Sequence, residues 1–228
     1  MEIDIQPSKE MALFYGILAG DGCISKSKRQ HLISITCSVY DDEPFIKNIV
    51  VPLLVNLRGK PVKYVNRWKE GKIEIKFSDK EFFYSIKSLG FPIGKKGNIE
   101  IPDIFPRDLY KYIVSGYFAT DGCIVLADNN GILYPRIEIQ SISNRILYQI
   151  KDFLISCGMS GNVYRITRRS GLYRGDVIYR MQFNGYDNLI RFKELIDFIN
   201  PKQEDKFKNY MKCRCSSAVE RHMKRRSS

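Results

Sequence analysis

Residues 14–22 read FYGILAGDG and residues 114–122 read VSGYFATDG, so the chain carries the same nine-residue phrase twice. Each copy is an apolar segment with small residues at four-residue spacing, and each ends in Asp-Gly. An apolar run of this kind predicts a buried helix. Its recurrence in the same register predicts a chain made of two similar halves.

Small residues recur along one side of each predicted helix. Gly16 and Gly20 lie one helical turn apart in the first copy, as do Gly116 and Thr120 in the second. Side chains four residues apart share a helix face, and small residues there let two backbones approach closely. We therefore expect the two helices to pack on each other, which brings the aspartates at their ends side by side.

Asp21 and Asp121 end the two phrases, where an acidic residue is electrostatically unfavourable. The C-terminal end of a helix prefers a cation, and an acid there costs on the order of 0.3–1 kcal/mol. Taken singly, a small-residue stripe is commonly packing, and Asp-Gly is commonly a turn with a left-handed glycine. Because both copies keep the aspartate, the pattern favours a pair of carboxylates that binds a divalent metal.

Length and composition are those of a folded protein with a basic surface. The 228 residues allow one or two domains, and 44% hydrophobic residues with a mean hydropathy of −0.27 are ordinary for a soluble globule. The apolar runs are too short to span a bilayer, and the N-terminal sequence lacks a signal-peptide pattern. We therefore expect an intracellular protein of the cytoplasm, nucleoid or an organelle, not secreted and with no membrane partner. The net charge of +12 is spread along the chain and is typical of nucleic-acid binding.

Cysteine and histidine usage argues against two kinds of site. The six cysteines form no Cys-x-x-Cys pair, and the only histidines are His31 and His222. A tetrahedral zinc site and a histidine-based hydrolase are therefore not expected. Cys23 and Cys123 follow the two Asp-Gly pairs, and we interpret them as small, half-buried strand residues without chemistry.

The duplication extends past the two phrases and predicts the order helix, hairpin, helix, hairpin, helix in each half. Ser8 is the expected cap of the first motif helix, and Pro106 opens the second. Strands are expected over 31–39 and 136–142, amphipathic helices over 42–54 and 144–157, second hairpins over 62–68 with 72–78 and 162–169 with 176–184, and closing helices over 80–89 and 186–199. We expect the first half to span residues 1–100, the second 101–212, and a poorly anchored basic tail 213–228.

The strands 72–78 and 176–184 alternate apolar residues with Lys, Glu, Arg, Gln or Asn. An ordinary antiparallel sheet with one wet face has this pattern. So does a two-stranded ribbon that reads base edges in the major groove of DNA. Two such hairpins in a basic chain with paired acidic helices favour the DNA-binding interpretation.

With both phrases and the duplicated order established, the chain resembles the LAGLIDADG homing endonucleases, in the single-chain form with two motif copies. Residues 14–22 and 114–122 fill the nine motif positions, and the duplicated order extends the resemblance over most of the chain. Both copies depart at the sixth position, where Ala19 and Ala119 replace the family's aspartate. In the family the metal ligand is the eighth position, and both copies keep aspartate there.

The resemblance implies an α+β fold of two pseudo-symmetric αββαββα halves. The motif helices would form the internal interface, and the antiparallel sheets would form a concave DNA-binding saddle. It also implies a monomeric, intron-encoded enzyme of intron homing that hydrolyses both strands of a long, asymmetric double-stranded DNA target and leaves 3′ overhangs. The expected cofactor is Mg²⁺, as two or three divalent ions, with Mn²⁺ as a substitute.

The expected metal site comprises Asp21 and Asp121 together with Gly20 and Thr120, the residues that precede them. Metal ions lower the pKa of bound water, so no histidine is needed to generate the nucleophile. A polar strand residue completes the family's site, and Gln140 fits that role in the second half, with Ser38 as its counterpart in the first.

The family also places a basic residue in each half near the hydrolytic water. Position after the last helix assigns this role to Lys96 and Lys206, with Lys95 and Lys202 as close competitors. A lysine near phosphate is also often a simple backbone contact. The residues expected to contact DNA are basic or amide side chains on strands and loops: Lys26, Lys28, Arg29, Lys63, Arg67, Lys72, Lys76, Arg136, Arg165, Arg168, Arg180 and Gln182.

Two alternative functions remain open at this level. One is a LAGLIDADG RNA maturase, which assists intron splicing, has intron RNA as its partner and can keep the nuclease site. The other is a catalytically silent DNA-binding protein, which retention of both aspartates disfavours. A nuclease embedded in an intein is not expected, because the chain has neither a nucleophilic first residue nor a terminal His-Asn pair.

Overall fold

The computed structural model describes residues 7–226 except 131 and 169–174, and for residues 215–226 it describes only the course of the helix. Most of the segment between the strands predicted over 162–169 and 176–184, and the side chains of most of the predicted tail, therefore lie outside the described residues. The elements of the first half are α1 (Lys9–Asp21), β1 (Gly22–Lys26), β2 (His31–Ser38), α2 (Glu43–Phe45), a π-helical segment (Ile46–Val50), α3 (Val51–Arg58), β3 (Tyr64–Arg67), a 3₁₀ turn (Trp68–Glu70), β4 (Lys72–Ser78) and α4 (Lys80–Ser88).

The second half repeats this order. Its elements are a 3₁₀ turn (Arg107–Leu109), α5 (Tyr110–Asp121), β5 (Gly122–Asn129), β6 (Ile132–Ser141), α6 (Asn144–Ser156), β7 (Gly161–Thr167), β8 (Val177–Asn184) and α7 (Tyr186–Leu195), followed by the long helix α8 (Pro201–Arg226). The predicted α+β class and the two αββαββα halves are confirmed.

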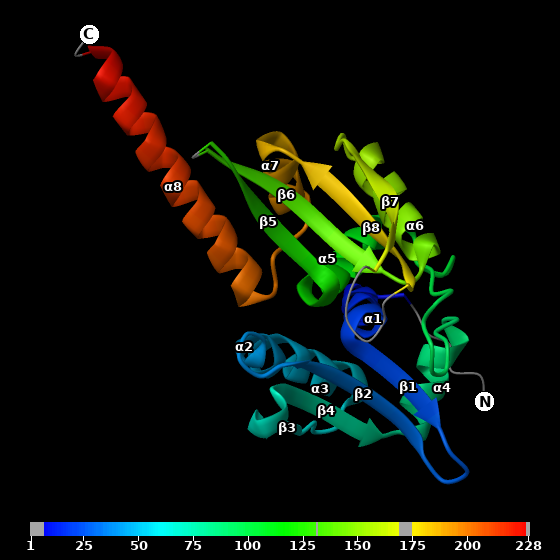
Figure 1. The fold of residues 1–228 in the computed structure, drawn as a ribbon. Helices are drawn as coiled ribbons and strands as arrows, with labels where there is room; N and C mark the ends of the chain where they lie inside the picture. Colours follow the sequence, from blue (N-terminus) through cyan, green and yellow to red (C-terminus); the bar gives the residue numbers. More distant parts are fainter. Residues whose placement is uncertain (1–6, 131, 169–174, 227–228) are drawn as a thin grey trace.

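Each half forms one four-stranded antiparallel sheet. The strand orders are β1-β2-β4-β3 and β5-β6-β8-β7, so the two sheets have the same topology. Gly22 pairs with Ile35, and Gly122 pairs with Ile139, which makes Ile35 and Ile139 equivalent positions. Figure 1 shows the two sheets apart from each other, with α1 and α5 between them and α8 extending away from the body of the protein.

Helices α1 and α5 pack against each other through the small residues predicted for this contact. A methyl group added at Gly16 would overlap the carbonyl oxygen of Ile113, and one added at Gly116 would overlap that of Leu13. Nearer the helix ends, the side chain of Thr120 fills the space that a larger residue at position 20 would need. Close backbone approach is therefore the reason for glycine at these positions.

The same helices are buried on their other sides by the core of each half. Phe14 and Leu18 of α1 and Tyr117 and Phe118 of α5 are at most 1% exposed. The N-terminus of α1 is fixed by Ser8, whose Oγ accepts a hydrogen bond from a backbone N–H of the first turn at 3.1 Å, as predicted. Rigid burial of both motif helices fixes where their C-terminal residues lie.

The glycines that follow the two aspartates are not left-handed turn residues. Gly22 and Gly122 have φ of −90° and −89°, in the extended region, so the chain passes from helix directly into strand. Glycine is needed there for space, because a Cβ at Gly22 would lie 2.6 Å from Cα of Leu18. The turn interpretation of Asp-Gly is therefore wrong.

Three helix boundaries differ from the prediction. The helix expected over 42–54 is interrupted by the π-helical segment, because Pro52 clashes with a regular preceding turn and has no N–H to donate. After this interruption it continues to Arg58. The helix expected over 186–199 ends at Leu195, because Ile196 is extended and its side chain is buried in the core. Helix α8 continues past residue 212, after which a tail was expected, and the predicted domain limits stay predictions.

No helix in the described part of the chain combines the length and the apolar character needed to cross a membrane.

Candidate active site

Asp21 and Asp121 are the last residues of α1 and α5, so the packing of these helices brings them together. The position of a Cβ on Gly20 lies 3.5 Å from Cγ of Asp121, which places the second carboxyl group directly over the end of α1. Each aspartate also precedes the first strand of its sheet. The pair therefore lies where the helix interface meets both sheets.

Burial and mutual repulsion make this carboxylate pair unfavourable in its charged form. Desolvation raises the pKa of Asp121 to about 7, and the negative charge of Asp21 adds to this effect while Lys96 opposes it. Desolvation also raises the pKa of Asp21 above its usual range, against the opposing effect of a hydrogen bond from Cys37. A cation bound between the carboxylates would stabilise the charged form of both.

Lys96 lies at the same end of α1, as its predicted role requires. Its Nζ donates to the carbonyl oxygen of Ala19 at 2.9 Å and to that of Gly20. These carbonyls have no partner within the helix, and they form the negative end of its dipole. Burial lowers the pKa of Lys96, although the charges of Asp121 and Asp21 oppose that shift.

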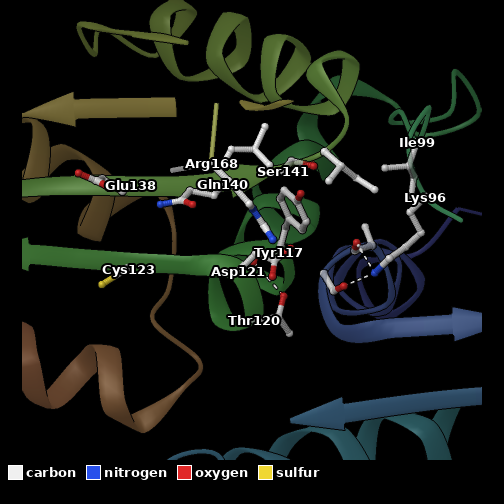
Figure 2. Close-up of a pocket in the computed structure, with 14 residues that line it drawn as sticks. Lys96, Ile99, Tyr117, Thr120, Asp121, Cys123, Glu138, Gln140, Ser141 and Arg168 are labelled. Carbon is white, nitrogen blue, oxygen red and sulfur yellow. Dashed lines mark hydrogen bonds between the residues drawn. The ribbon is translucent and has the colours of Figure 1, made fainter. Parts of the chain in front are cut away.

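A cavity of about 450 Å³ opens beside these groups and collects residues from both halves. Figure 2 shows Lys96 on one side of it, Asp121 and Thr120 on its floor, and Gln140 and Arg168 above them. The cavity thus brings together a lysine, a carboxylate and an amide, three groups predicted for the hydrolytic site.

The second-half lysines are placed differently from Lys96. Lys206 is exposed, with its Nζ 3.8 Å from Sγ of Cys123, which also lines the cavity. Lys202, its competitor, forms an ion pair with Asp42 at 2.6 Å. The carbonyl of Ala119, equivalent to the Ala19 carbonyl that binds Lys96, accepts instead from Nδ2 of Asn200 at 2.8 Å.

Strand register identifies the first-half counterpart of Gln140. Because Ile35 and Ile139 are equivalent, Gln140 corresponds to Thr36. The expected counterpart, Ser38, is two residues further along β2, and its Oγ donates to Asp41 at 3.3 Å. The assignment of Ser38 is therefore corrected to Thr36, since the sequence pattern did not define the pairing of β2 with β1.

Cys37 is a functional candidate that the sequence did not reveal. It is 6% exposed on the core side of β2, and its Sγ donates to Oδ2 of Asp21 at 3.3 Å. Cys23 and Cys123, by contrast, are the half-buried strand residues that were expected. Only the pairing of β2 with β1, which returns β2 to the end of α1, brings Cys37 to the aspartate.

The oxygen donors at this site fit a hard divalent cation. Carboxylate and carbonyl oxygens are the ligands that Mg²⁺, Mn²⁺ and Ca²⁺ prefer. Within the described residues no cluster of three or more His, Cys, Asp or Glu side chains could enclose an ion, so the two aspartates would supply the side-chain ligands. The carbonyl of Gly20, a predicted ligand, accepts a hydrogen bond from Lys96, whereas Thr120 donates its hydroxyl to the Tyr117 carbonyl at 2.9 Å.

Basic residues of the first sheet share its face opposite the covering helices. Lys72 pairs with Arg67 and Lys76 pairs with Ser34, and directly paired residues of antiparallel strands point to the same side. Arg67 also contacts Glu74 at 3.1 Å, so part of its charge is offset. Lys63 precedes β3 and is exposed.

On the second sheet, the predicted DNA-reading side chains gather around Glu138, which is 8% exposed. Its carboxylate accepts from Nη1 of Arg136 at 3.0 Å and from Nε2 of Gln182 at 2.9 Å. Nε of Arg180 lies 3.6 Å away on the other side. Glu138 therefore orients these three side chains, a role that alternation along the strand did not predict.

The remaining predicted contacts lie in three places. Lys26 donates to the hydroxyl of Tyr84 at 2.9 Å, on the side of the first sheet that α4 covers, and Arg165 pairs with Tyr179, away from the face that bears Arg180. Lys28 and Arg29 are exposed in the turn between β1 and β2, and Arg168 lines the cavity.

Comparison with known proteins supports this architecture. Residues 108–197 match the LAGLIDADG-like domain family. Structures of the homing endonuclease I-DmoI superpose with a TM-score of 0.59 at 16% identity over 82% of this chain and 94% of that one. I-SmaMI bound to uncleaved DNA with calcium ions superposes with a TM-score of 0.57 at 11% identity, over 92% of each chain. I-WcaI bound to its DNA recognition sequence also gives 0.57, at 16% identity over 90% of this chain and 88% of that one.

Two curated relatives come from Methanocaldococcus jannaschii. A probable translation initiation factor IF-2 is 29% identical over 223 residues, which cover 94% of this chain and 18% of the relative. An uncharacterized protein is 24% identical over 174 residues, which cover 72% of this chain and 60% of the relative. The chain thus spans less than two thirds of either relative. Residues 108–197 form a LAGLIDADG-like domain, and the chain has the fold of the LAGLIDADG homing endonucleases.

Proposed function

We propose that this protein is a site-specific DNA endonuclease that uses a divalent metal to hydrolyse both strands of a long, asymmetric target and leaves 3′ overhangs. The observation that carries the proposal is the pair of aspartates at the ends of α1 and α5, with Asp121, Lys96 and Gln140 gathered at one cavity. A purely structural domain has no need for two carboxylates held together against the cost of burial.

The substrate follows from the two sheet faces that flank the aspartates. The first sheet presents Lys and Arg side chains, the second presents Arg and Gln, and the net charge is +12. Such faces bind phosphates through charge and base edges through hydrogen bonds. Related structures include I-DmoI in complex with DNA and calcium or manganese, in keeping with duplex DNA as the partner and a divalent ion as the cofactor.

The chemistry assigns a separate role to each group. Asp21 and Asp121 would hold the metal, which would supply charge neutralisation at the phosphate and a water of lowered pKa. Lys96 places a positive charge and a proton at Nζ next to the phosphate oxygens, where negative charge develops. Gln140 orients the attacking water through its amide.

Both aspartates belong to one chain, so the proposed enzyme works as a monomer inside the cell. Mg²⁺ is the expected ion, and Mn²⁺ is a substitute. Two dissimilar sheets can read the two sides of an asymmetric site. DNA binding should weaken steeply as salt rises, because neutralised phosphates release counterions.

The decisive experiment uses two DNA substrates. One is a plasmid in which the sequences flanking this reading frame are joined, and the other is a plasmid library with random inserts. We expect the wild-type chain to linearise a defined sequence with Mg²⁺ and not with EDTA. Asp21→Asn and Asp121→Asn should lose cleavage while binding the same DNA, and Asp41→Asn, which removes an exposed carboxylate nearby, should cut normally. Full cleavage by either catalytic-site variant would remove the metal-site argument, and absence of cleavage by the wild type would favour the maturase function.

A further inference from the structure

The surroundings of Asp21 and Asp121 are not chemically equivalent in the two halves. Asp42 and Ser143 occupy matching positions, each directly before the helix that follows the first hairpin of its half. Ser143 is fully buried, and its Oγ donates to the carbonyl of Ile99 at 2.7 Å. Asp42 is 5% exposed, so the first half has a buried carboxylate where the second has a neutral hydroxyl.

Asp42 connects the first half to the start of α8. Its Oδ2 accepts from the backbone N–H of Ser38 at 3.2 Å, and its Oδ1 accepts from Nδ2 of Asn200 at 2.8 Å. The same Oδ1 lies 2.6 Å from Nζ of Lys202. A short contact between a largely buried carboxylate and an ammonium holds the lysine in one place and offsets its charge.

This network lies next to Asp21. Ser38, which Asp42 holds, follows Cys37, whose thiol donates to the Asp21 carboxylate. Asp42 thus joins Lys202, through Ser38 and Cys37, to the carboxylate of Asp21. Lys202 is the second-half lysine on the Asp21 side of the site.

The two lysines differ in what they contact. Lys96, near Asp121, donates to uncharged carbonyl groups, so its charge stays available to a phosphate. Lys202 is paired with a carboxylate. A positive charge aimed at a phosphate stabilises the charge that develops during hydrolysis, and a neighbouring anion subtracts from that effect.

We propose that Asp42 is a positioning residue that holds Lys202 and offsets its charge, so that the groups around Asp21 cut their DNA strand more slowly than the groups around Asp121 cut theirs. The inference rests on the proposed endonuclease function and goes beyond it, because it assigns the order of the two cuts to a particular ion pair. Asp42→Ser copies the residue that the other half uses at this position.

The first test resolves the two strands in time. A duplex that the wild type cuts is labelled on one strand or the other, and each strand is also supplied in a duplex whose opposite strand is already nicked. We expect unequal rates for the wild type. In Asp42→Ser the slower strand should accelerate roughly two- to fivefold, the factor that one partly exposed ion pair contributes, with the faster strand unchanged. Asp41→Asn should leave the ratio of rates as it is, and Asp42→Glu, which restores the charge, should return it toward the wild-type ratio.

The second test does not depend on cleavage. In the DNA-free protein, modification by an amine-reactive reagent is followed by peptide mass spectrometry at Lys202 and at Lys206, which is exposed and bears no carboxylate contact among the contacts described for it. Lys202 should react more slowly than Lys206, and Asp42→Ser should remove the difference. If circular dichroism shows that this variant is unfolded, Asp42→Asn replaces it.

The outcomes separate the inference from the function on which it rests. Equal strand rates in the wild type, acceleration of both strands alike, or equal labelling of the two lysines would overturn the role of Asp42 while the endonuclease function stands. Absence of cleavage by the wild type on any substrate would overturn the endonuclease function, and the strand order with it.

Discussion

Replacing Gly116 by alanine should separate the two motif helices and destabilise the whole protein. The added methyl group would overlap the carbonyl oxygen of Leu13 and lie 2.8 Å from N of Ile17 and 3.2 Å from C of Gly16. These are backbone atoms of a buried helix, so no side chain can rotate to make room. The helices must move apart along their whole contact.

The size of the effect follows from two opposing contributions. Overpacking a well-filled core costs about 1–3 kcal/mol, and a backbone clash belongs at the upper end of that range. Alanine in place of glycine within a helix recovers about 1 kcal/mol. We therefore expect the free energy of unfolding of Gly116→Ala to fall by about 2 kcal/mol, a large part of the ordinary stability of a domain.

Urea denaturation followed by circular dichroism measures this loss directly. Gly97→Ala is the matched control, because a Cβ there meets no heavy atom within 4 Å. That variant should be as stable as the wild type or more stable by up to about 1 kcal/mol. If Gly116→Ala unfolds at the wild-type urea concentration, the close approach of α1 and α5 is not what holds the two aspartates together.

Three further predictions concern the site and the second sheet. The pKa of Asp121 is about 7 in the folded protein against 3.8 unfolded, so the folded state binds the proton more tightly, and the free energy of unfolding should fall as pH rises from 3.8 to about 7. Asp121→Asn should flatten this fall in metal-free denaturation curves, and a curve unchanged by the substitution would disprove the shift. Lys96→Met should reduce cleavage by two orders of magnitude or so while DNA affinity in gel shifts changes little, since the role assigned to Lys96 is stabilisation of the transition state; an equal loss in binding would make it a phosphate contact instead. Glu138→Gln should strengthen binding to non-cognate duplexes and steepen the salt dependence, because Arg136 and Arg180 lose the carboxylate that offsets their charge; an unchanged salt slope would show that neither arginine reaches the DNA.

Much of the fold could be predicted because the deciding signals are local and repeated. The small residues at four-residue spacing and the Asp-Gly ends of the phrases defined the helix pair. The two-residue alternation of 31–39 and 72–78 defined the sheet faces. The helix boundaries were harder to predict. Pro52, for example, does not end its helix, because the π-helical segment before it makes room for the proline ring.

The site was predictable only where a residue's position along the chain also fixes its position in space. Asp21 and Asp121 meet this condition because they end the two motif helices. Lys96 meets it because the segment after α4 leads back to the end of α1. Gln140 and its counterpart depended on strand register, which the sequence left uncertain, so Ser38 was chosen in place of Thr36. The contacts of Asp42 with Asn200 and Lys202 could not be predicted, because these residues are about 160 positions apart and no repeated pattern links them.

The non-equivalence of the two halves is the consequence of joining them in one chain. In a symmetric pair of identical halves, a change that improves one catalytic end is imposed on the other, and both strands are cut by the same groups. Here equivalent positions near the aspartates differ: Cys37 against Ser141, Thr36 against Gln140, and Asp42 against Ser143. The glycine-lined helix contact and the two terminal aspartates are held in common, because close packing and metal binding constrain both copies in the same way. Differences between the residues around Asp21 and those around Asp121 can therefore change the order and the rate of the two cuts without disturbing the helix contact that holds the aspartates together.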